Sequence, residues 1–257
     1  MLSSPVSILR FIVRFVVLIG FLVFVLPVVV FLMNRNRQLG TGKGTKKADA
    51  VSVWLARRLA WLFGIRVEIR GEPVEPPVLF AANHMSWLDI PVLHSGCAMG
   101  FVGKAEIEQW PVFSHIARAG GTIFHQRGNH DSAAGVTMAM AERLREGRAV
   151  AIFPEGGIKP GAGMRVFHAR MFKPAVEVGC RVQPVMLRYM HNGERDDDFQ
   201  FRVGETMLQN FLRVLARRRV TAEVHFLPAI EAAGKPRREL AEAARAVVGE
   251  HFEREVA

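Results

Sequence analysis

Cysteine is scarce in this chain, which has two, Cys97 and Cys180, among its 257 residues. Two cysteines cannot build the dense disulfide framework of a small secreted domain, and their spacing matches no zinc motif. We therefore expect both to be core residues of a protein that works in a reducing compartment.

Two common catalytic patterns are also missing. The Gly-x-Ser-x-Gly turn of serine hydrolases does not occur. A glycine-rich string with one lysine, residues 40–45, looks like part of a phosphate-binding P-loop. However, Arg37 stands where that loop needs its first glycine, and Gly44 stands where Ser or Thr must follow the lysine. The sequence therefore favours neither a serine acyl-enzyme nor a P-loop nucleotide site.

Acidic residues are nearly absent from the N-terminal part. Residues 1–60 hold nine Lys or Arg and one acid, Asp49, which gives a net charge of +8, whereas the remaining 197 residues carry only +2. The total of +10 therefore does not indicate a nucleic-acid-binding domain, whose body would carry the basic residues. Basic residues beside an apolar segment suit an anionic lipid surface instead.

Charge is absent from Phe15 to Met33, and nearly all of these nineteen residues are Val, Leu, Phe or Ile. A helix of this length extends about 28 Å, close to the roughly 30 Å of a bilayer core, and no cleavage site of a signal peptide follows it. Arg14 and Pro27 leave a straight span and a kinked or re-entrant helix both open. Because the richer basic cluster follows the segment, we expect a bacterial-type inner-membrane protein whose catalytic body faces the cytoplasm.

Behind a polar connector, residues 51–65 form an amphipathic pattern with tryptophans among the apolar residues and Arg57 and Arg58 on the other side. This pattern is typical of a helix in the membrane interface, although an ordinary domain helix with inward tryptophans stays open. We expect residues 1–65 to anchor the protein and residues 66–257 to form one folded domain.

That domain alternates short β-rich runs with helical patterns. The expected strands are residues 67–70, 78–82, 101–104, 122–125, 149–153, 182–188 and 222–227, and the expected helices are residues 88–95, 108–119, 132–146, 170–178, 205–219 and 237–252. Such alternation predicts an α/β fold with a mostly parallel central sheet flanked by helices.

Four expected strands carry unusual polar residues. The second ends at Asn83-His84, the fourth at Gln126-Arg127 and the fifth at Pro154-Glu155-Gly156-Gly157, while the sixth contains Gln183-Pro184-Val185. Carboxyl ends of parallel strands meet in one crevice, so we expect a base, a guanidinium, a carboxylate and a glycine turn there together. Asp89 follows His84 by five positions and could hold a neutral imidazole that accepts a proton near neutral pH. A histidine held by a turn aspartate for purely structural reasons is the alternative.

These residues also form four ordered blocks: Asn83-His84 with Asp89, Gly121 to Arg127 (Gly-Thr-Ile-Phe-His-Gln-Arg), Phe153 to Gly156 (Phe-Pro-Glu-Gly), and Val182 to Val185 (Val-Gln-Pro-Val). In these blocks the chain resembles the glycerolipid acyltransferases, in particular the lysophosphatidic acid acyltransferases, over about residues 76–190. It departs from them after the third block, where Gly157-Ile158-Lys159 replaces the usual Thr-Arg-Ser.

The resemblance implies that His84 is the general base and Asp89 its orienting carboxylate. It also implies substrate contacts for Asn83, Lys104, Arg127, Glu155 and Gly156. At the departure, Lys159 or Arg165 could supply the positive charge that is missing from the third block. The expected reaction moves a fatty acyl group from acyl-CoA or acyl-carrier protein to the sn-2 hydroxyl of lysophosphatidic acid, without metal or organic cofactor and without an acyl-enzyme. Another lysolipid acceptor such as lyso-ornithine lipid, a metal-dependent membrane hydrolase and a non-catalytic adaptor are the alternatives.

Overall fold

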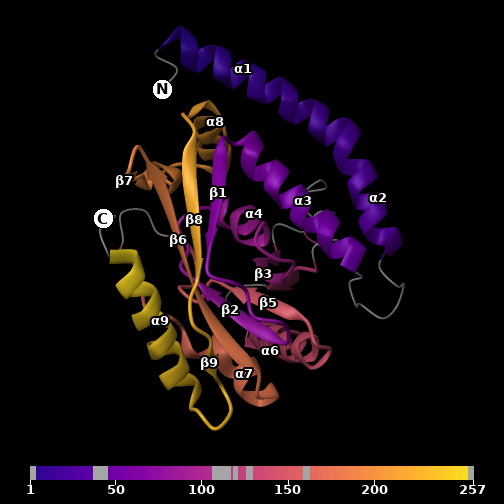
Figure 1. Cartoon of the computed structure of the whole chain (residues 1–257), viewed down its shortest axis with the longest axis vertical. Coiled ribbons are helices and arrows are strands. Elements are labelled where there is room, and N and C mark those ends of the chain that lie inside the picture. The colour runs from indigo at the N-terminus through magenta and orange to yellow at the C-terminus, as the bar shows by residue number, and fades with distance from the viewer. Residues whose placement is uncertain are drawn as a thin grey trace.

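The computed structural model describes residues 4–36, 46–105, 117, 121–125, 130–158 and 163–253. In this part of the chain, a nine-stranded, mostly parallel sheet lies between two layers of helices (Figure 1). The strands are β1 (Ile65–Arg70), β2 (Val78–Ala82), β3 (Gly100–Lys104), β4 (Ile123–His125), β5 (Ala149–Ile152), β6 (Arg181–His191), β7 (Glu194–Arg195), β8 (Val220–Phe226) and β9 (Ile230–Glu231). The helices are α1 (Pro5–Gly20), α2 (Leu26–Asn36), α3 (Lys46–Leu62), α4 (Asp89–His94), α6 (His130–Arg145), α7 (Lys173–Val178), α8 (Met207–Ala216) and α9 (Arg237–Glu253), with a π-helical turn at Phe21–Val25 and 3₁₀ turns at Ala169–Phe172 and Asp197–Phe199.

Strand β2 lies at the centre of the sheet and is buried over its whole length. Val78, Phe80 and Ala82 face the core shared with α3 and α4, whereas Leu79 and Ala81 face the core shared with α6, α7 and α9. This explains why the strand is a continuous apolar run: both of its faces are covered by helices.

The sheet order is β1-β8-β6-β2-β5-β3-β4, and β2, β5, β3, β4 and the first part of β6 run parallel. The carboxyl ends of β2 and β5 are therefore neighbours at one edge, as the sequence predicts. The second half of β6 pairs antiparallel with β8, and β8 runs parallel to β1. The predicted α/β fold is confirmed, and the short strands β7 and β9 are additions that the sequence did not predict.

The predicted sixth-strand motif does not lie at the edge of the sheet that carries His84. Gln183 stands near the start of β6, and its amide bonds the backbone of Val74, Glu72 and Leu227 at 2.9–3.0 Å. Since β6 runs parallel to β2, the start of β6 lies at the opposite edge from His84. This glutamine therefore joins loops at the amino ends of the strands.

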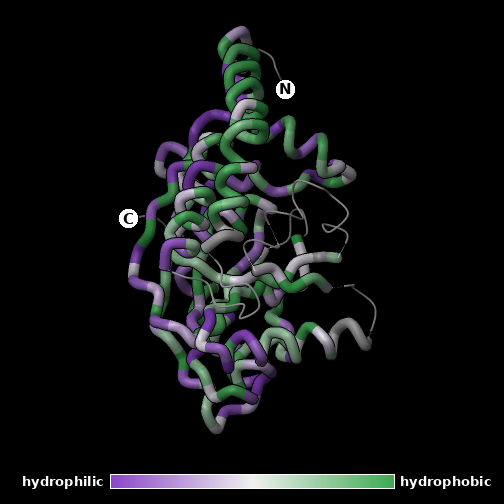
Figure 2. The backbone as a smooth tube through the Cα atoms, turned by 90° about the vertical axis from the view of Figure 1, so that its right-hand side faces the viewer, coloured by the Kyte–Doolittle hydropathy of each residue, from purple (hydrophilic) through white to green (hydrophobic). Residues whose placement is uncertain are grey.

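The N-terminal apolar segment forms one continuous curved helix from α1 through α2 (Figure 1). It begins at Pro5, ten residues before the predicted start, and residues 5–32 are long and apolar enough to cross a membrane by length and composition. The π-helical turn lies just before Pro27, where the backbone N–H of Leu26 bonds the carbonyl of Phe21. A π turn adjusts the helix to the missing N–H of proline, so the segment bends without breaking. Figure 2 shows its apolar residues extending past the body of the protein.

Helix α3 packs one face inward and leaves its tryptophans outside. Ala60 and Leu62 are buried in the domain core, and Leu55 packs against α2. Trp54 and Trp61 are 41% and 56% exposed. Both tryptophans therefore point away from the core, which favours the interfacial interpretation over the ordinary domain helix.

Candidate active site

The turn after β2 explains the five-residue spacing of His84 and Asp89. Asp89 is the first residue of α4, and its Oδ2 accepts hydrogen bonds from the backbone N–H groups of Met85 at 2.6 Å and Ser86 at 2.8 Å. The same oxygen lies 2.8 Å from His84 Nδ1. The carboxylate therefore holds both its own turn and the imidazole ring.

The His84 ring is fixed from two directions and keeps one nitrogen available. Its plane stacks on Phe153 at the end of β5, with ring centroids 4.0 Å apart and an angle of 13°. In the neutral ring, an Nδ1–H that donates to Asp89 leaves the lone pair on Nε2. The side chain is 14% exposed, whereas Asp89 is fully buried. The geometry therefore suits a base whose partner carboxylate is shielded from water.

Tyr189 on β6 completes this arrangement, and no motif in the sequence marks it. Its hydroxyl donates a 2.7 Å hydrogen bond to Asp89 Oδ1, and its ring stacks on Phe199 at 4.9 Å. Burial, together with the neighbouring Asp89 carboxylate, raises the pKa of Tyr189 well above its ordinary value. Tyr189 therefore remains a donor and stabilises the buried negative charge.

Replacing Tyr189 with phenylalanine is expected to lower kcat about tenfold, because a hydrogen bond to a buried charge contributes about 1.5 kcal/mol. KM should change little, because a cavity opens beside His84 and Tyr189 is not among the described residues that line it. Steady-state transfer kinetics check this split. A Tyr189→Phe enzyme that is folded and has wild-type kcat would show that Asp89 does not need this donor.

Glu155 joins the two loops that frame the site. Its Oε1 accepts the backbone N–H of His84 at 2.8 Å, and its Oε2 accepts the backbone N–H of Arg165 at 3.0 Å. Burial raises the pKa of Glu155, and these two N–H donors oppose the rise. Both carboxylate oxygens therefore position backbone groups, and the expected contact of Glu155 with the acceptor hydroxyl stays a prediction.

Gly156 follows with a positive φ of 78°, a backbone conformation that glycine adopts without strain. A Cβ atom here would stand 3.1 Å from His168 Nε2, so a larger residue would also press on that ring. The glycine therefore allows the chain to turn tightly between Glu155 and the loop that carries Arg165.

Asn83 lines the cavity beside His84 and also bonds the backbone of β6, and its expected substrate contact stays a prediction. Its Nδ2 donates to the carbonyl of Leu187 at 2.9 Å, and its Oδ1 accepts the N–H of Leu187 at 2.7 Å. Only 2% of the residue is exposed. The side chain therefore continues the pairing of β2 with β6 past the end of β2, and both ends of its amide are used for this.

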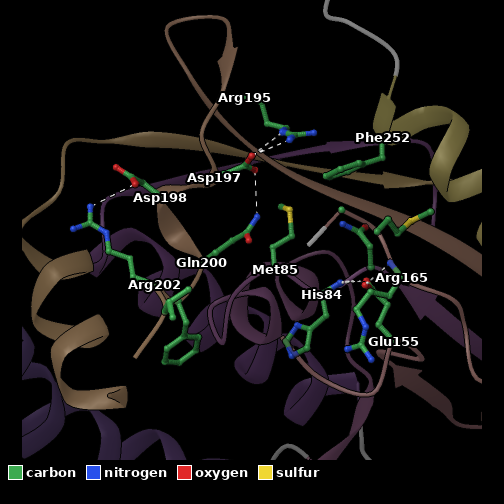
Figure 3. Close-up of a pocket in the computed structure, with 15 residues that line it drawn as sticks. His84, Met85, Glu155, Arg165, Arg195, Asp197, Asp198, Gln200, Arg202 and Phe252 are labelled. Atoms are coloured by element: carbon green, nitrogen blue, oxygen red, sulfur yellow. Dashed lines mark hydrogen bonds and ion pairs between the residues drawn. The ribbon is translucent and has the colours of Figure 1, made fainter. Parts of the chain in front are cut away.

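A cavity of about 380 Å³ opens beside His84 and Glu155 (Figure 3). Its wall carries Arg165, which also donates to the Gly157 carbonyl at 3.2 Å. The opposite side carries two ion pairs from the end of β7 and the segment that follows it (Figure 3). These are Arg195 with Asp197 at 2.8 Å and Arg202 with Asp198 at 3.5 Å. The cavity therefore offers guanidinium groups for an anion and carboxylates for a cation.

Helix α8 supports this wall and the histidine turn together. Asn210 accepts a 2.9 Å hydrogen bond from Trp87 Nε1 in the turn. Arg213 binds both carboxylate oxygens of Glu205 at 2.6 and 2.7 Å and the carbonyls of Asp198 and Gln200. This buried arginine therefore fixes the backbone that presents the cavity's ion pairs.

The pH dependence of stability should report on this support. The hydrogen bond from Arg213 lowers the pKa of Glu205 to about 2. A carboxyl with a lowered folded-state pKa stabilises the fold above its unfolded pKa and loses that contribution as the pH falls towards 2. We expect thermal unfolding of the wild type to lose more stability between about pH 5 and pH 3 than Glu205→Gln does. Parallel curves for the two proteins would contradict this.

Three expected phosphate or substrate contacts fall wholly or partly outside the described residues. Arg127 and Lys159 lie outside them, and Lys104 is described only as the last backbone position of β3. Because β3 runs parallel to β5, Lys104 stands at the catalytic edge of the sheet. These three contacts stay predictions.

A histidine held by a buried carboxylate at the carboxyl edge of an α/β sheet, beside a mixed-charge cavity, is an arrangement typical of enzymes that transfer groups by acid–base chemistry. The family model named Acyltransferase matches residues 65–188. Lyso-ornithine lipid O-acyltransferase of Pseudomonas aeruginosa is 34% identical over 240 residues, which cover 93% of this chain and 92% of that protein. The 1-acyl-sn-glycerol-3-phosphate acyltransferase of Neisseria gonorrhoeae is 30% identical, covering 88% and 91%.

The crystal structure of a 1-acyl-sn-glycerophosphate (LPA) acyltransferase from Thermotoga maritima superposes with a TM-score of 0.67 over 98% of both chains, at 19% identity. This likeness shows the shared fold. The chain belongs to the acyltransferase family of glycerolipid enzymes that includes the lysophosphatidic acid acyltransferases. Family membership favours acyl transfer over the hydrolase and adaptor alternatives.

Proposed function

We propose that the protein transfers a fatty acyl group from a thioester, acyl-CoA or acyl-carrier protein, to the sn-2 hydroxyl of lysophosphatidic acid. The observation that carries the proposal is the His84–Asp89 pair, in which Asp89 holds Nδ1 at 2.8 Å and Nε2 remains for the substrate at the cavity wall. No metal or organic cofactor is needed for this chemistry.

In the proposed reaction, His84 Nε2 takes the hydroxyl proton as the acceptor oxygen attacks the thioester carbonyl. Asp89 stabilises the imidazolium that forms, and Tyr189 stabilises Asp89. When the tetrahedral intermediate collapses, the carbon–sulfur bond breaks and the thiolate receives the proton from His84. The products are an ester and a free thiol, and the histidine returns to its starting state.

The proposed phosphate contacts are Arg127, Lys104 and Lys159, joined by Arg165 on the described cavity wall. Arginine suits phosphate because its planar guanidinium donates two parallel hydrogen bonds. Arg165 is also tied to the catalytic turn through Glu155. A phosphate held there would therefore lie at a fixed position relative to His84.

Lyso-ornithine lipid is the second candidate acceptor, and the charge balance of the cavity is compatible with it. Arg195 and Arg202 are each paired with an aspartate, which leaves little positive charge in excess on that wall. Such a wall can accept a headgroup that carries both charges. The Gly157-Ile158 departure in the third block and the 34% identical relative agree with this candidate.

An acceptor panel separates the two candidates. Full-length protein in vesicles receives one radiolabelled acyl donor and either lysophosphatidic acid, lyso-ornithine lipid or lysophosphatidylcholine, and kcat/KM is compared. The proposal expects the largest value with lysophosphatidic acid, and a larger value with lyso-ornithine lipid would select the second candidate. Donor hydrolysis without transfer to any of the three would contradict both.

We further propose that residues 1–65 anchor the domain of residues 66–257 to the cytoplasmic face of a bacterial inner membrane. The apolar helix of residues 5–32 and the exposed Trp54 and Trp61 support this placement.

A further inference from the structure

A second hollow lies between the membrane helix and the body, separate from the catalytic cavity. It measures about 520 Å³ and has none of its lining residues in common with the cavity beside His84. We call it the anchor groove. Its lining consists of Val6, Leu9, Arg10, Val13, Arg14 and Val17 of α1, Trp61 and Leu62 of α3, and Arg219 before β8.

One end of the anchor groove is strongly basic. Arg14 Nη1 donates to the carbonyls of Leu215 and Arg217 at 3.1 and 2.7 Å, and Arg10 Nη1 reaches the Ala216 carbonyl at 3.4 Å. These bonds satisfy the carbonyl end of α8, where positive charge is favourable. They hold both guanidiniums in place but supply no full negative charge.

Carboxylates are missing from the groove lining in the described part of the chain. The third arginine, Arg219, is exposed at the groove. Three positive charges thus gather beside an apolar surface, a costly arrangement unless an anion neutralises them. Further donors remain on these side chains, because a guanidinium carries five N–H groups.

The rest of the anchor groove is apolar and belongs to the membrane helix. Leu9 is 63% exposed and Val13 is 51% exposed, and both lie within the segment that is long and apolar enough to enter a bilayer. An apolar wall that ends in a basic cluster matches the two parts of a phospholipid, its acyl chain and its phosphate. A soluble phosphate could use the basic end only.

We propose that the anchor groove binds one anionic phospholipid of the membrane, with its phosphate at Arg10, Arg14 and Arg219 and an acyl chain along Val6, Leu9 and Val13. The lipid neutralises the basic cluster and fills the space between α1 and α3. It would thereby fix the anchor helix against α8, the helix that also supports the catalytic turn through Asn210 and Trp87.

Native mass spectrometry of the full-length protein tests whether the anchor groove binds an anionic phospholipid. The protein is incubated in detergent with phosphatidylglycerol, phosphatidylcholine or inorganic phosphate, and retained adducts are counted. We expect one retained phosphatidylglycerol and about a tenfold loss of retention in Arg10→Gln/Arg219→Gln, since each basic residue near an anionic lipid contributes several-fold. Arg218→Gln, an exposed neighbour that does not line the groove, should bind as the wild type does.

A second pair of variants tests the apolar wall without touching the arginines. Val13→Trp fills the groove and should lower retention, whereas Val16→Trp, 63% exposed on the same helix but outside the lining, should not. Equal retention of phosphatidylcholine, equal loss in the control variants, or binding of inorganic phosphate without lipid would overturn the proposal.

Discussion

Alanine in place of His84 is expected to lower kcat for acyl transfer by about 10² to 10⁴-fold, the usual contribution of a positioned general base. The acceptor hydroxyl is a weak nucleophile until its proton is removed, and His84 Nε2 is the group that the structure leaves available for this step. Because the ring also stacks on Phe153, its loss leaves a small space at the surface of the site, while Asp89 keeps its hydrogen bonds from Met85, Ser86 and Tyr189. Initial rates with saturating donor and acceptor measure the effect.

The control for this variant is His191→Ala. His191 is the partly buried last residue of β6, away from the turn of His84, and its Nδ1 lies 3.1 Å from the Arg219 carbonyl. This protein should keep kcat within about twofold of the wild type, because surface changes of this kind have small effects. A folded His84→Ala protein with near wild-type kcat would contradict the assignment of the base.

Alanine in place of Glu155 is expected to cost about 3 kcal/mol of unfolding free energy and about 100-fold in kcat. The truncation leaves the N–H groups of His84 and Arg165 without their acceptors at 2.8 and 3.0 Å, and an unpaired buried donor costs about 1–3 kcal/mol. The catalytic turn is then free to shift, and a displacement of about 1 Å at a reacting group is enough for such a rate loss. Denaturant unfolding and transfer kinetics measure the two effects.

Two further variants serve as comparisons for Glu155→Ala. Glu155→Gln keeps one carbonyl acceptor and should fall between alanine and the wild type in both measurements. Glu177→Ala on α7 removes a surface carboxylate paired with Lys173 at 3.2 Å, and should change stability by less than about 1 kcal/mol. If Glu155→Ala loses activity but keeps full stability, Glu155 contacts the substrate and its backbone bonds are secondary.

The sequence predicted the interactions of the site in which both residues are close together along the chain. His84 and Asp89 belong to one turn, so their spacing already indicates an ion pair. Tyr189 lies 100 residues from Asp89, and a tyrosine within a buried strand looks like a core residue. Its role depends on β6 lying next to β2, which spacing along the chain does not reveal.

Polar residues whose partners are backbone groups were the hardest to interpret. Asn83 and Glu155 stand in the motif and were expected to touch substrate, but each binds main-chain groups with both ends of its polar side chain. A motif shows that a residue type is needed at a position. It does not show whether the need comes from the ligand or from the loop.

The membrane helix illustrates the same limit for the fold. The run without charge begins at Phe15, and Arg14 lies inside the wider apolar stretch. In the structure, Arg10 and Arg14 lie within the helix because the carbonyl end of α8 receives their guanidiniums. The strands, by contrast, were predicted closely, since runs such as Val78–Ala82 are buried on both faces and contain no polar residue.

The central claim is that His84 activates the acceptor directly, with no acyl-enzyme. The most direct test is a single-turnover reaction of full-length protein with a radiolabelled acyl thioester, stopped by denaturation before and after lysolipid is added. The predicted result is no label on the protein before addition, and label in the lipid product afterwards. Stoichiometric label on the protein that passes to the acceptor at the rate of turnover would contradict the account.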